Sequence, residues 1–177
     1  MTVKSYKEHF PKLAQRVLID DSAVVIGKVT LADDCSIWPL VVVRADVNTI
    51  TIGTRSNVQD GSVLHVTRPS NTYPQGLALT IGDDVTIGHN ATLHACQIGN
   101  RVLVGMGAIV LDGVIIEDDV MLGAGALVPP GKRLQSGYLY LGSPVTRARK
   151  LSAEEIEFLR QSALNYQQLK DEYLAQH

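Results

Sequence analysis

The sequence predicts an all-β domain built as a parallel β-helix of hexapeptide repeats, followed by one α-helix packed on its outside. Aliphatic residues recur every six positions, a small or β-branched residue follows four places after most of them, and glycine often comes directly after the aliphatic. A period of six fits neither an amphipathic helix nor an alternating hairpin. It fits very short strands with a turn in every hexapeptide, so that three hexapeptides close one triangular coil and coils stack at about 4.8 Å, the strand spacing.

The repeat is expected to fill residues 19–145, after a lead-in segment of residues 1–18. The inward aliphatic positions are Ile19, Val25, Leu31, Ile37 and Val43; Ile52, Val58 and Leu64; Ile81, Ile87 and Leu93; and Ile98, Val104, Val110, Ile116, Leu122, Val128 and Leu134. Three breaks interrupt the period, with intervals of nine, seventeen and five residues. The longest break contains an insertion at residues 67–79 that is rich in Pro, Asn and Gly, which predicts an external loop.

Residues 146–177 are expected to form a linker and a helix, the helix covering about residues 152–174. Ser152 and Glu155 have the spacing of a capping box. Apolar residues then recur at helical spacing, with either Leu169 or Lys170 on the apolar stripe. The stripe predicts that this helix lies against the outside of the β-helix.

Composition argues against several classes of partner. The net charge of −2 and the pI near 6.2 argue against binding of nucleic-acid phosphates, and the 5% of aromatic residues argues against base stacking. Neither an apolar run of membrane-spanning length nor a signal peptide is evident, so no membrane partner is expected. Cys35 and Cys96 lie far apart without a CxxC motif, which fits a reducing cytoplasm.

Two histidines are predicted to stack on one side of the prism. The coils are taken to begin at Ile19, Ile37, Ile52, Ile81, Ile98 and Ile116. His65 and His94 then follow the inward aliphatic at the same position of successive coils, about one strand spacing apart. Two imidazoles at that spacing can share one metal ion, because Zn–N bonds are about 2.0–2.1 Å long.

A second polar group is predicted on the neighbouring side. His89 comes two residues after its inward aliphatic, with Asp60 directly beneath it, and Gln59 and Arg44 are placed on that same side. If three copies pack around a threefold axis, the second side of one copy faces the third side of the next. The pattern therefore predicts a homotrimer in which His89 of one subunit joins His65 and His94 of another.

The chain resembles the γ-class carbonic anhydrases over nearly its whole length. The matching motifs are "RAD" at residues 44–46, "NVQDGSVLH" at 57–65 and "IGHNATLH" at 87–94. The resemblance implies a left-handed coil and a trimer with intersubunit metal sites. It also implies that His65, His89 and His94 bind Zn²⁺, with Fe²⁺ and Co²⁺ as alternative ions. Zinc lowers the pKa of its water to about 7, the value known for carbonic anhydrase itself, and the resulting hydroxide hydrates CO2 to bicarbonate.

The resemblance implies roles for five further residues. Gln59 matches a residue near the metal-bound water, and Tyr166 matches a tyrosine that lines the site. Arg44, Asp46 and Asp60 match charges at the interface and in the active site. Each has a structural alternative: intersubunit ion pairs for the charged residues, a stacked turn residue for Gln59, and apolar helix packing for Tyr166.

The chain departs from the family archetype in two places, and two other functions stay open. Val47 follows the "RAD" motif where the archetype has glutamate, and the loop "VTRPSNTYPQG" contains Arg68 but no carboxylate to serve as a proton shuttle. One alternative is an acyltransferase or thioesterase acting on a CoA-type substrate, with one histidine as general base. The other is a metal-binding protein with little or no anhydrase activity.

Overall fold

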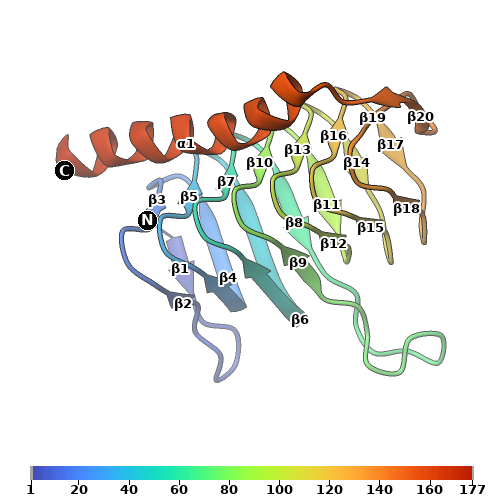
Figure 1. The fold of residues 1–177 in the computed structure, drawn as a ribbon. Coiled ribbons are helices and arrows are strands. Elements are labelled where there is room, and N and C mark those ends of the chain that lie inside the picture. The colour runs from blue at the N-terminus through green and yellow to red at the C-terminus, as the bar shows by residue number, and fades with distance from the viewer. Residues whose placement is uncertain (1, 177) are drawn as a thin grey trace.

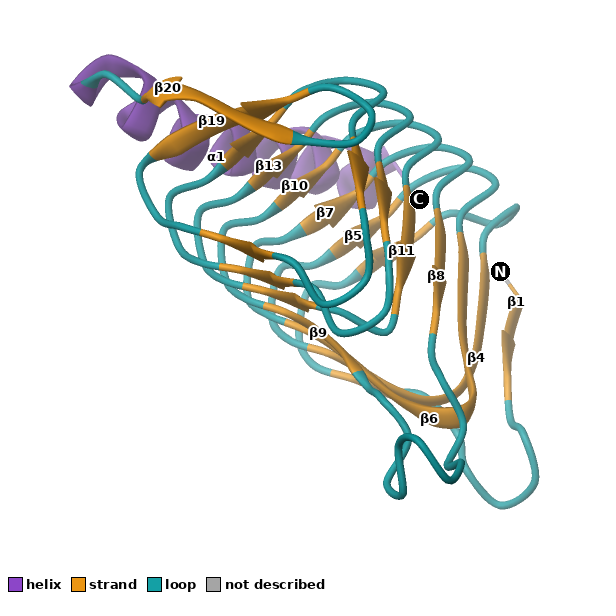
Figure 2. Cartoon of the chain, turned by 90° about the vertical axis from the view of Figure 1, so that its right-hand side faces the viewer, coloured by secondary structure: helices purple, strands orange, loops and turns teal. Residues whose placement is uncertain are grey.

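The computed structural model describes residues 2–176 and has the predicted left-handed parallel β-helix with one helix along its outside (Figure 1). The view along the coils shows a triangular section with three faces (Figure 2). Most strands have only two or three residues, because the chain reaches a corner within each hexapeptide. Residues 1 and 177, which belong to the expected terminal segments, lie outside the described part.

We name the three faces after what they carry. The helix face consists of β3 (Leu18–Ile19), β5 (Ser36–Ile37), β7 (Asn57–Val58), β10 (Thr86–Ile87), β13 (Leu103–Val104), β16 (Met121–Leu122), β19 (Tyr138–Leu141) and the antiparallel β20 (Thr146–Lys150). The histidine face consists of β1 (Thr2–Lys4), the first parts of β4 (Val24–Leu31) and β6 (Val42–Ile52), β8 (Val63–His65), β11 (Thr92–His94), β14 (Ile109–Val110) and β17 (Leu127–Val128). The third face consists of β2 (Lys12–Leu13), the last parts of β4 and β6, β9 (Leu79–Ile81), β12 (Gln97–Ile98), β15 (Ile115–Ile116) and β18 (Arg133–Leu134).

Inward side chains of successive coils stack into columns that fill the prism. On the histidine face, one column contains Val43, Leu64, Leu93 and Val110, all fully buried and paired in register. Burial of each such side chain contributes roughly 1.5–3 kcal/mol relative to exposure. The predicted hexapeptide core is therefore confirmed.

One part of the predicted coil grouping is wrong. The strand β6 runs without interruption around a corner: Val43 pairs with β8 on the histidine face, and Ile52 pairs with β9 on the third face. The nine-residue interval between these two residues is therefore one lengthened corner, and no side of the coil is missing. Ile52 ends the coil that begins at Ile37, whereas the sequence grouping began a new coil there. As a result, what the grouping called the second side is the histidine face before Ile52 but the helix face after it.

The seventeen-residue interval holds a projecting loop, as predicted. The backbones of Thr67 and Leu77 pair across its neck, and the loop extends away from the prism (Figure 1). The side-chain nitrogen of Asn48, in the lengthened corner of β6, donates to the carbonyls of Thr67 and Gln75 at 3.2 and 3.0 Å. The loop is thus fastened to the corner beside the histidine face.

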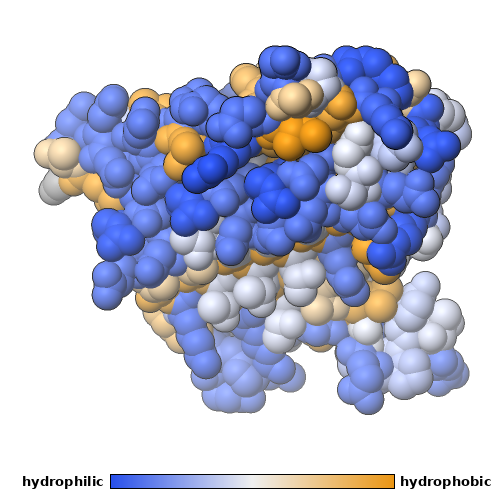
Figure 3. Space-filling view, in the orientation of Figure 1, coloured by the Kyte–Doolittle hydropathy of each residue, from blue (hydrophilic) through white to orange (hydrophobic). Residues whose placement is uncertain are grey.

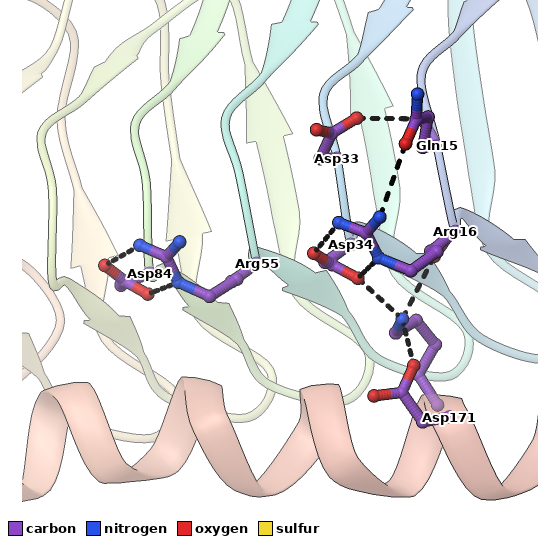
Figure 4. A network of polar contacts seen from close by, with 8 residues as sticks. Gln15, Arg16, Asp33, Asp34, Arg55, Asp84 and Asp171 are labelled. Carbon is purple, nitrogen blue, oxygen red and sulfur yellow. Dashed lines mark hydrogen bonds and ion pairs between the residues drawn. The ribbon is translucent and has the colours of Figure 1, made fainter.

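The corner between the third face and the helix face carries a column of alternating charge, which we call the corner ladder. Its members are Arg16, Asp34, Arg55, Asp84, Arg101 and Asp119, all with φ between 51° and 61°. Each arginine bonds the aspartate of the next coil, at 2.8, 2.6 and 2.7 Å in chain order, and Figure 4 shows the first two pairs. The arginine side chains are partly exposed, so water screens each pair, although Asp34 and Asp84 themselves are buried. The pairs mainly fix the corner geometry.

The helix α1 (Ala153–Gln176) runs back along the helix face towards the N-terminal coils (Figure 1). Its capping box is present: Ser152 N donates to Glu155 Oε2 at 2.9 Å, and Glu155 N donates to Ser152 Oγ at 3.2 Å. Of the two candidates for the apolar stripe, Lys170 is fully buried while Leu169 is 38% exposed. Within residues 2–176, no helix combines the length and the hydropathy needed to cross a bilayer.

Gly105 shows why glycine so often follows the inward aliphatic. A Cβ at Gly105 would lie 2.4 Å from the nitrogen of Ala124 and 2.5 Å from the carbonyl carbon of Gly123 in the next coil. Gly105→Ala is therefore expected to force coils apart and to lower the free energy of unfolding by at least about 1 kcal/mol in urea titrations. The control is Gly107→Asn, which places at this corner the residue found as Asn90 one coil below, and the position has open space for a Cβ. This control should change the free energy of unfolding by less than about 0.5 kcal/mol. A Gly105→Ala protein as stable as the control would contradict this account.

Candidate metal centre

His65 and His94 lie side by side at the ends of β8 and β11, as predicted. The two residues are paired in register on the histidine face. Their ring centroids are 5.1 Å apart, and Nδ1 of His65 lies 3.1 Å from Nε2 of His94. Both side chains are partly buried, so the two facing nitrogens form a fixed pair of potential ligands.

The outer nitrogen of each ring is held by a carboxylate. His65 Nε2 lies 3.0 Å from Asp46 Oδ1, and His94 Nδ1 lies 2.5 Å from Asp112 Oδ1. Ionised carboxylates only accept hydrogen bonds, so both outer nitrogens carry hydrogen and donate it. If both rings are neutral, their facing nitrogens then present two lone pairs to each other. The repulsion between these lone pairs is relieved by a cation bound between the two nitrogens, or by protonation of one ring, which turns the contact into a hydrogen bond.

The distance between the facing nitrogens suits a metal ion. Two Zn–N bonds of about 2.0–2.1 Å at a tetrahedral angle place their nitrogens about 3.3 Å apart. The observed separation of 3.1 Å is close to that value. Histidine ligands of zinc commonly donate their other N–H to a carboxylate, which is the arrangement of both rings. The residues present therefore fit two of the ligand positions of a zinc site.

Both carboxylates are held in the ionised state. Burial opposes ionisation of Asp46, but hydrogen bonds from His65 and Arg44 outweigh it and keep the pKa of Asp46 below its ordinary value. Burial likewise opposes ionisation of Asp112, whose pKa is lowered by hydrogen bonds from Thr67 and the adjacent histidine. At neutral pH, each carboxylate therefore accepts the imidazole N–H.

His89 lies at a different corner, between the helix face and the histidine face. Its Nδ1 is 2.9 Å from Oδ2 of Asp60, which lies one coil below as predicted, so its Nε2 is left for another partner. Within residues 2–176, no three His, Cys, Asp or Glu side chains of one chain are arranged to hold a metal ion. Because His89 belongs to another corner than His65 and His94, one chain does not complete the predicted three-histidine site by itself.

A largely apolar groove of about 370 Å³ lies between α1 and the helix face and reaches His89. Its apolar walls include Leu103, Val104, Met106, Met121, Leu122 and Leu139. Figure 3 shows hydrophobic surface beneath the first part of α1, over the coils of β13 and β16. Gln59, which is 4% exposed, and Tyr166 line the same groove.

Tyr166 packs against the prism and also faces the groove, and its predicted role at the site stays a prediction. Its ring packs edge-on against Trp38, with centroids 5.7 Å apart, and it also lines the groove that reaches His89. Burial and the negative charge of Asp60 raise the pKa of the Tyr166 hydroxyl. The helix therefore places a protonated phenol near the second polar group.

The position of Arg44 corrects the sequence analysis. Arg44 pairs in register with Ile26 on the histidine face, and its Nη1 donates to Asp46 Oδ2 at 2.5 Å. It belongs with His65 rather than with the His89 group, because the lengthened corner of β6 shifted the assigned sides. Within one chain, Arg44 thus bonds Asp46, which in turn bonds His65.

Sequence reasoning missed Asp112 and Thr67. Asp112 comes two residues after the inward Val110, the same position that Asp60 and His89 hold after their own inward aliphatics. That position was therefore a usable signal for a polar residue at a corner. Thr67, by contrast, lies in the neck of the insertion, where the repeat gives no register.

These features define the class of the protein: a left-handed hexapeptide β-helix with a histidine–carboxylate centre. The family described as "Bacterial transferase hexapeptide (six repeats)" matches residues 95–130. A solved structure of a putative acetyltransferase from Bacillus cereus is 37% identical, with a TM-score of 0.92, over 99% of this chain and 98% of that one.

The curated relatives narrow the class to a family. "Protein YrdA" of Escherichia coli strain K12 is 64% identical over 98% of this chain and 95% of its own length. "Probable carbonic anhydrase" of Methanocaldococcus jannaschii is 40% identical over 90% and 96%, and "Gamma carbonic anhydrase 1, mitochondrial" of Arabidopsis thaliana is 41% identical over 99% and 64%. The chain belongs to the γ-class carbonic anhydrase-like family of hexapeptide-repeat proteins.

Proposed function

We propose that this chain forms a homotrimer that binds one Zn²⁺ at each subunit interface and hydrates CO2 to bicarbonate there. The ligands are His65 and His94 of one subunit and His89 of the partner subunit, with Fe²⁺ and Co²⁺ as alternative ions. The observation that carries the proposal is the pair of facing imidazole nitrogens 3.1 Å apart, each ring held by a carboxylate on its other side. The family membership supports the same function.

Exposed apolar side chains support a second copy at the histidine face. Val63 and Ile109 on this face are 40% and 41% exposed. Leu40 and Met106 are 67% and 61% exposed along the corner that carries His89. Since Leu40 also has a φ of 60°, which disfavours a leucine, this corner is better explained by contact with another subunit than by folding of one chain. A ring closed by such contacts uses two different patches of each subunit.

Each polar residue has a proposed part in the reaction. Zinc at this position would supply activation of a water for attack on CO2 near neutral pH. Asp46 and Asp60 orient His65 and His89 by accepting their outer N–H groups, and Arg44 keeps Asp46 ionised. Gln59 and Tyr166 line the groove beside His89, where Gln59 would orient CO2 or bicarbonate and Tyr166 would donate a hydrogen bond.

Metal analysis combined with CO2 hydration tests this proposal. Protein purified without oxygen is expected to contain about one divalent ion per subunit and to hydrate CO2 above the buffer background in stopped-flow measurements. A strong chelator should abolish the activity, and one equivalent of Zn²⁺ should restore it. A metal-replete trimer without CO2 hydration would contradict the anhydrase proposal, although the metal site would stand.

A second candidate function is transfer or hydrolysis of an acyl group from a CoA thioester. The apolar groove beside the His89–Asp60 pair favours it, since such a groove can hold an acyl chain next to a general base. The solved Bacillus cereus relative is described as a putative acetyltransferase. Thioester binding that Met106→Glu in the groove abolishes would favour this function over CO2 hydration.

A further inference from the structure

The two oxygens of the Asp112 carboxylate each accept a hydrogen bond, one from the candidate metal centre and one from the insertion. Oδ1 accepts from His94 Nδ1 at 2.5 Å, and Oδ2 accepts a short hydrogen bond from Thr67 Oγ1. Asp112 follows β14, one coil above His94, and Thr67 stands in the neck of the insertion. The side chains of Asp112 and His94 are only 28% and 32% exposed, so water competes weakly for these bonds.

This arrangement selects one tautomer and one orientation of His94. A carboxylate at Nδ1 requires hydrogen on that nitrogen, which leaves the lone pair on Nε2. The lone pair is then directed at Nδ1 of His65, 3.1 Å away. Without Asp112, the ring could carry its hydrogen on Nε2 or rotate, and either change removes a ligand from the site.

We propose that Asp112 is a positioning residue that fixes the metal-binding tautomer of His94, and that Thr67 holds Asp112 in place and so couples the insertion to the site. The proposal rests on the proposed function in that the centre holds a metal ion. Loss of a carboxylate behind a histidine ligand weakens metal affinity by about 10–100-fold in comparable sites. Loss of the Thr67 hydroxyl acts one bond further away, so a smaller loss is expected.

Competition with a chromophoric chelator measures the zinc dissociation constant of the assembled protein. Asp112→Ala is expected to raise the zinc dissociation constant about 10–100-fold. Asp112→Asn should raise it less, because its amide oxygen can still accept the hydrogen bond from His94, and Thr67→Val should raise it least. The control is Asp119→Asn, a corner-ladder aspartate that bonds Arg101 at 2.7 Å and forms no hydrogen bond to a histidine within residues 2–176. Unchanged zinc affinity in a folded Asp112→Ala protein would overturn the proposal.

The tautomer of His94 provides a readout that does not depend on metal. Long-range ¹H–¹⁵N spectra of the metal-free protein are expected to show hydrogen on Nδ1 of His94 in the wild type, and a mixture of tautomers in Asp112→Asn and Asp112→Ala. Hydrogen on Nε2 in the wild type would overturn the proposal. A wild type with the expected tautomer but no zinc affinity would instead defeat the proposed function alone.

Discussion

Replacing His89 with alanine is expected to lower the bound metal from about one ion per subunit to near zero, with each chain still folded. The side chain is 38% exposed at a corner and bonds Asp60 but fills no part of the core, so its loss removes a ligand without opening a cavity. Plasma mass spectrometry after dialysis measures the metal, and circular dichroism checks the fold. The control His9→Ala removes a similarly exposed histidine, paired with Glu8, and should keep its metal. Full metal retention by His89→Ala would contradict the ligand assignment.

Mixing two inactive variants tests whether the site is shared between subunits. His89→Ala subunits still offer the His65–His94 pair, and His94→Ala subunits still offer His89. Trimers that contain both variants are expected to have one intact site each. In such a ring, only one interface joins the His65–His94 pair of a His89→Ala subunit to the His89 of a His94→Ala subunit. Metal binding and CO2 hydration should return together in the mixture. Mixed trimers that remain free of metal would show that the three histidines do not combine across subunits.

The repeat made the core and the stacked histidines predictable. Each inward position must be apolar in every coil, so the inward residues recur every six positions along the chain. Members three repeats apart, such as Leu64, Leu93 and Val110, form one column once the inserted loop and the one-residue deletion are set aside. His65 and His94 each follow a member of that column, so the repeat, with the inserted loop set aside, predicts the register in which they pair. The prediction failed for Arg44, because the nine residues between Val43 and Ile52 could equally be one lengthened corner or a coil with one side missing. The sequence does not distinguish these two cases.

Contacts between elements that share no period were not predictable. The corner ladder does keep the coil register, its members pairing across 18, 29 and 18 residues, but it was missed because only the positions at and after the inward aliphatics were followed in the sequence. Lys170 and Asp34 are 136 residues apart, and their meeting depends on where α1 lies along the prism. The apolar stripe predicts which side of the helix faces the prism, but not how far along the prism the helix lies.

Removal of Lys170 is expected to be among the costliest changes to the attachment of α1. Lys170 is fully buried, and its Nζ donates to Asp34 Oδ1 at 2.9 Å and to the Arg16 carbonyl at 3.1 Å. Lys170→Ala leaves a cavity and removes one partner of a buried ion pair. Because Arg16 still bonds Asp34, we expect a loss of about 3 kcal/mol, the low end for such changes.

Trp38 offers a direct probe of this loss. It is the one tryptophan of the chain and packs edge-on against Tyr166 and Tyr173 of α1, with centroids 5.7 and 5.1 Å apart. Its fluorescence during urea titration therefore reports release of the helix together with unfolding. The exposed Lys12→Ala is the control and should remain within about 0.5 kcal/mol of the wild type. A Lys170→Ala protein with an unchanged urea midpoint would show that the buried ammonium does not fasten the helix.

Acid titration separates the charge of Lys170 from its packing. Hydrogen bonds from Arg16 hold the pKa of Asp34 at about 2, against burial and with further help from Lys170. Since this folded pKa is below the unfolded value of about 3.9, the stabilisation from Asp34 is complete above about pH 4 and is lost as the pH falls towards 2. Lys170→Ala removes part of the pKa depression, so this protein should lose less stability between pH 4 and 2 than the wild type does. Urea midpoints at each pH give stability as a function of pH for the wild type and for Lys170→Ala. A purely steric contribution does not change with the protonation of Asp34. Parallel curves for the two proteins would therefore mean that Lys170 acts by packing alone.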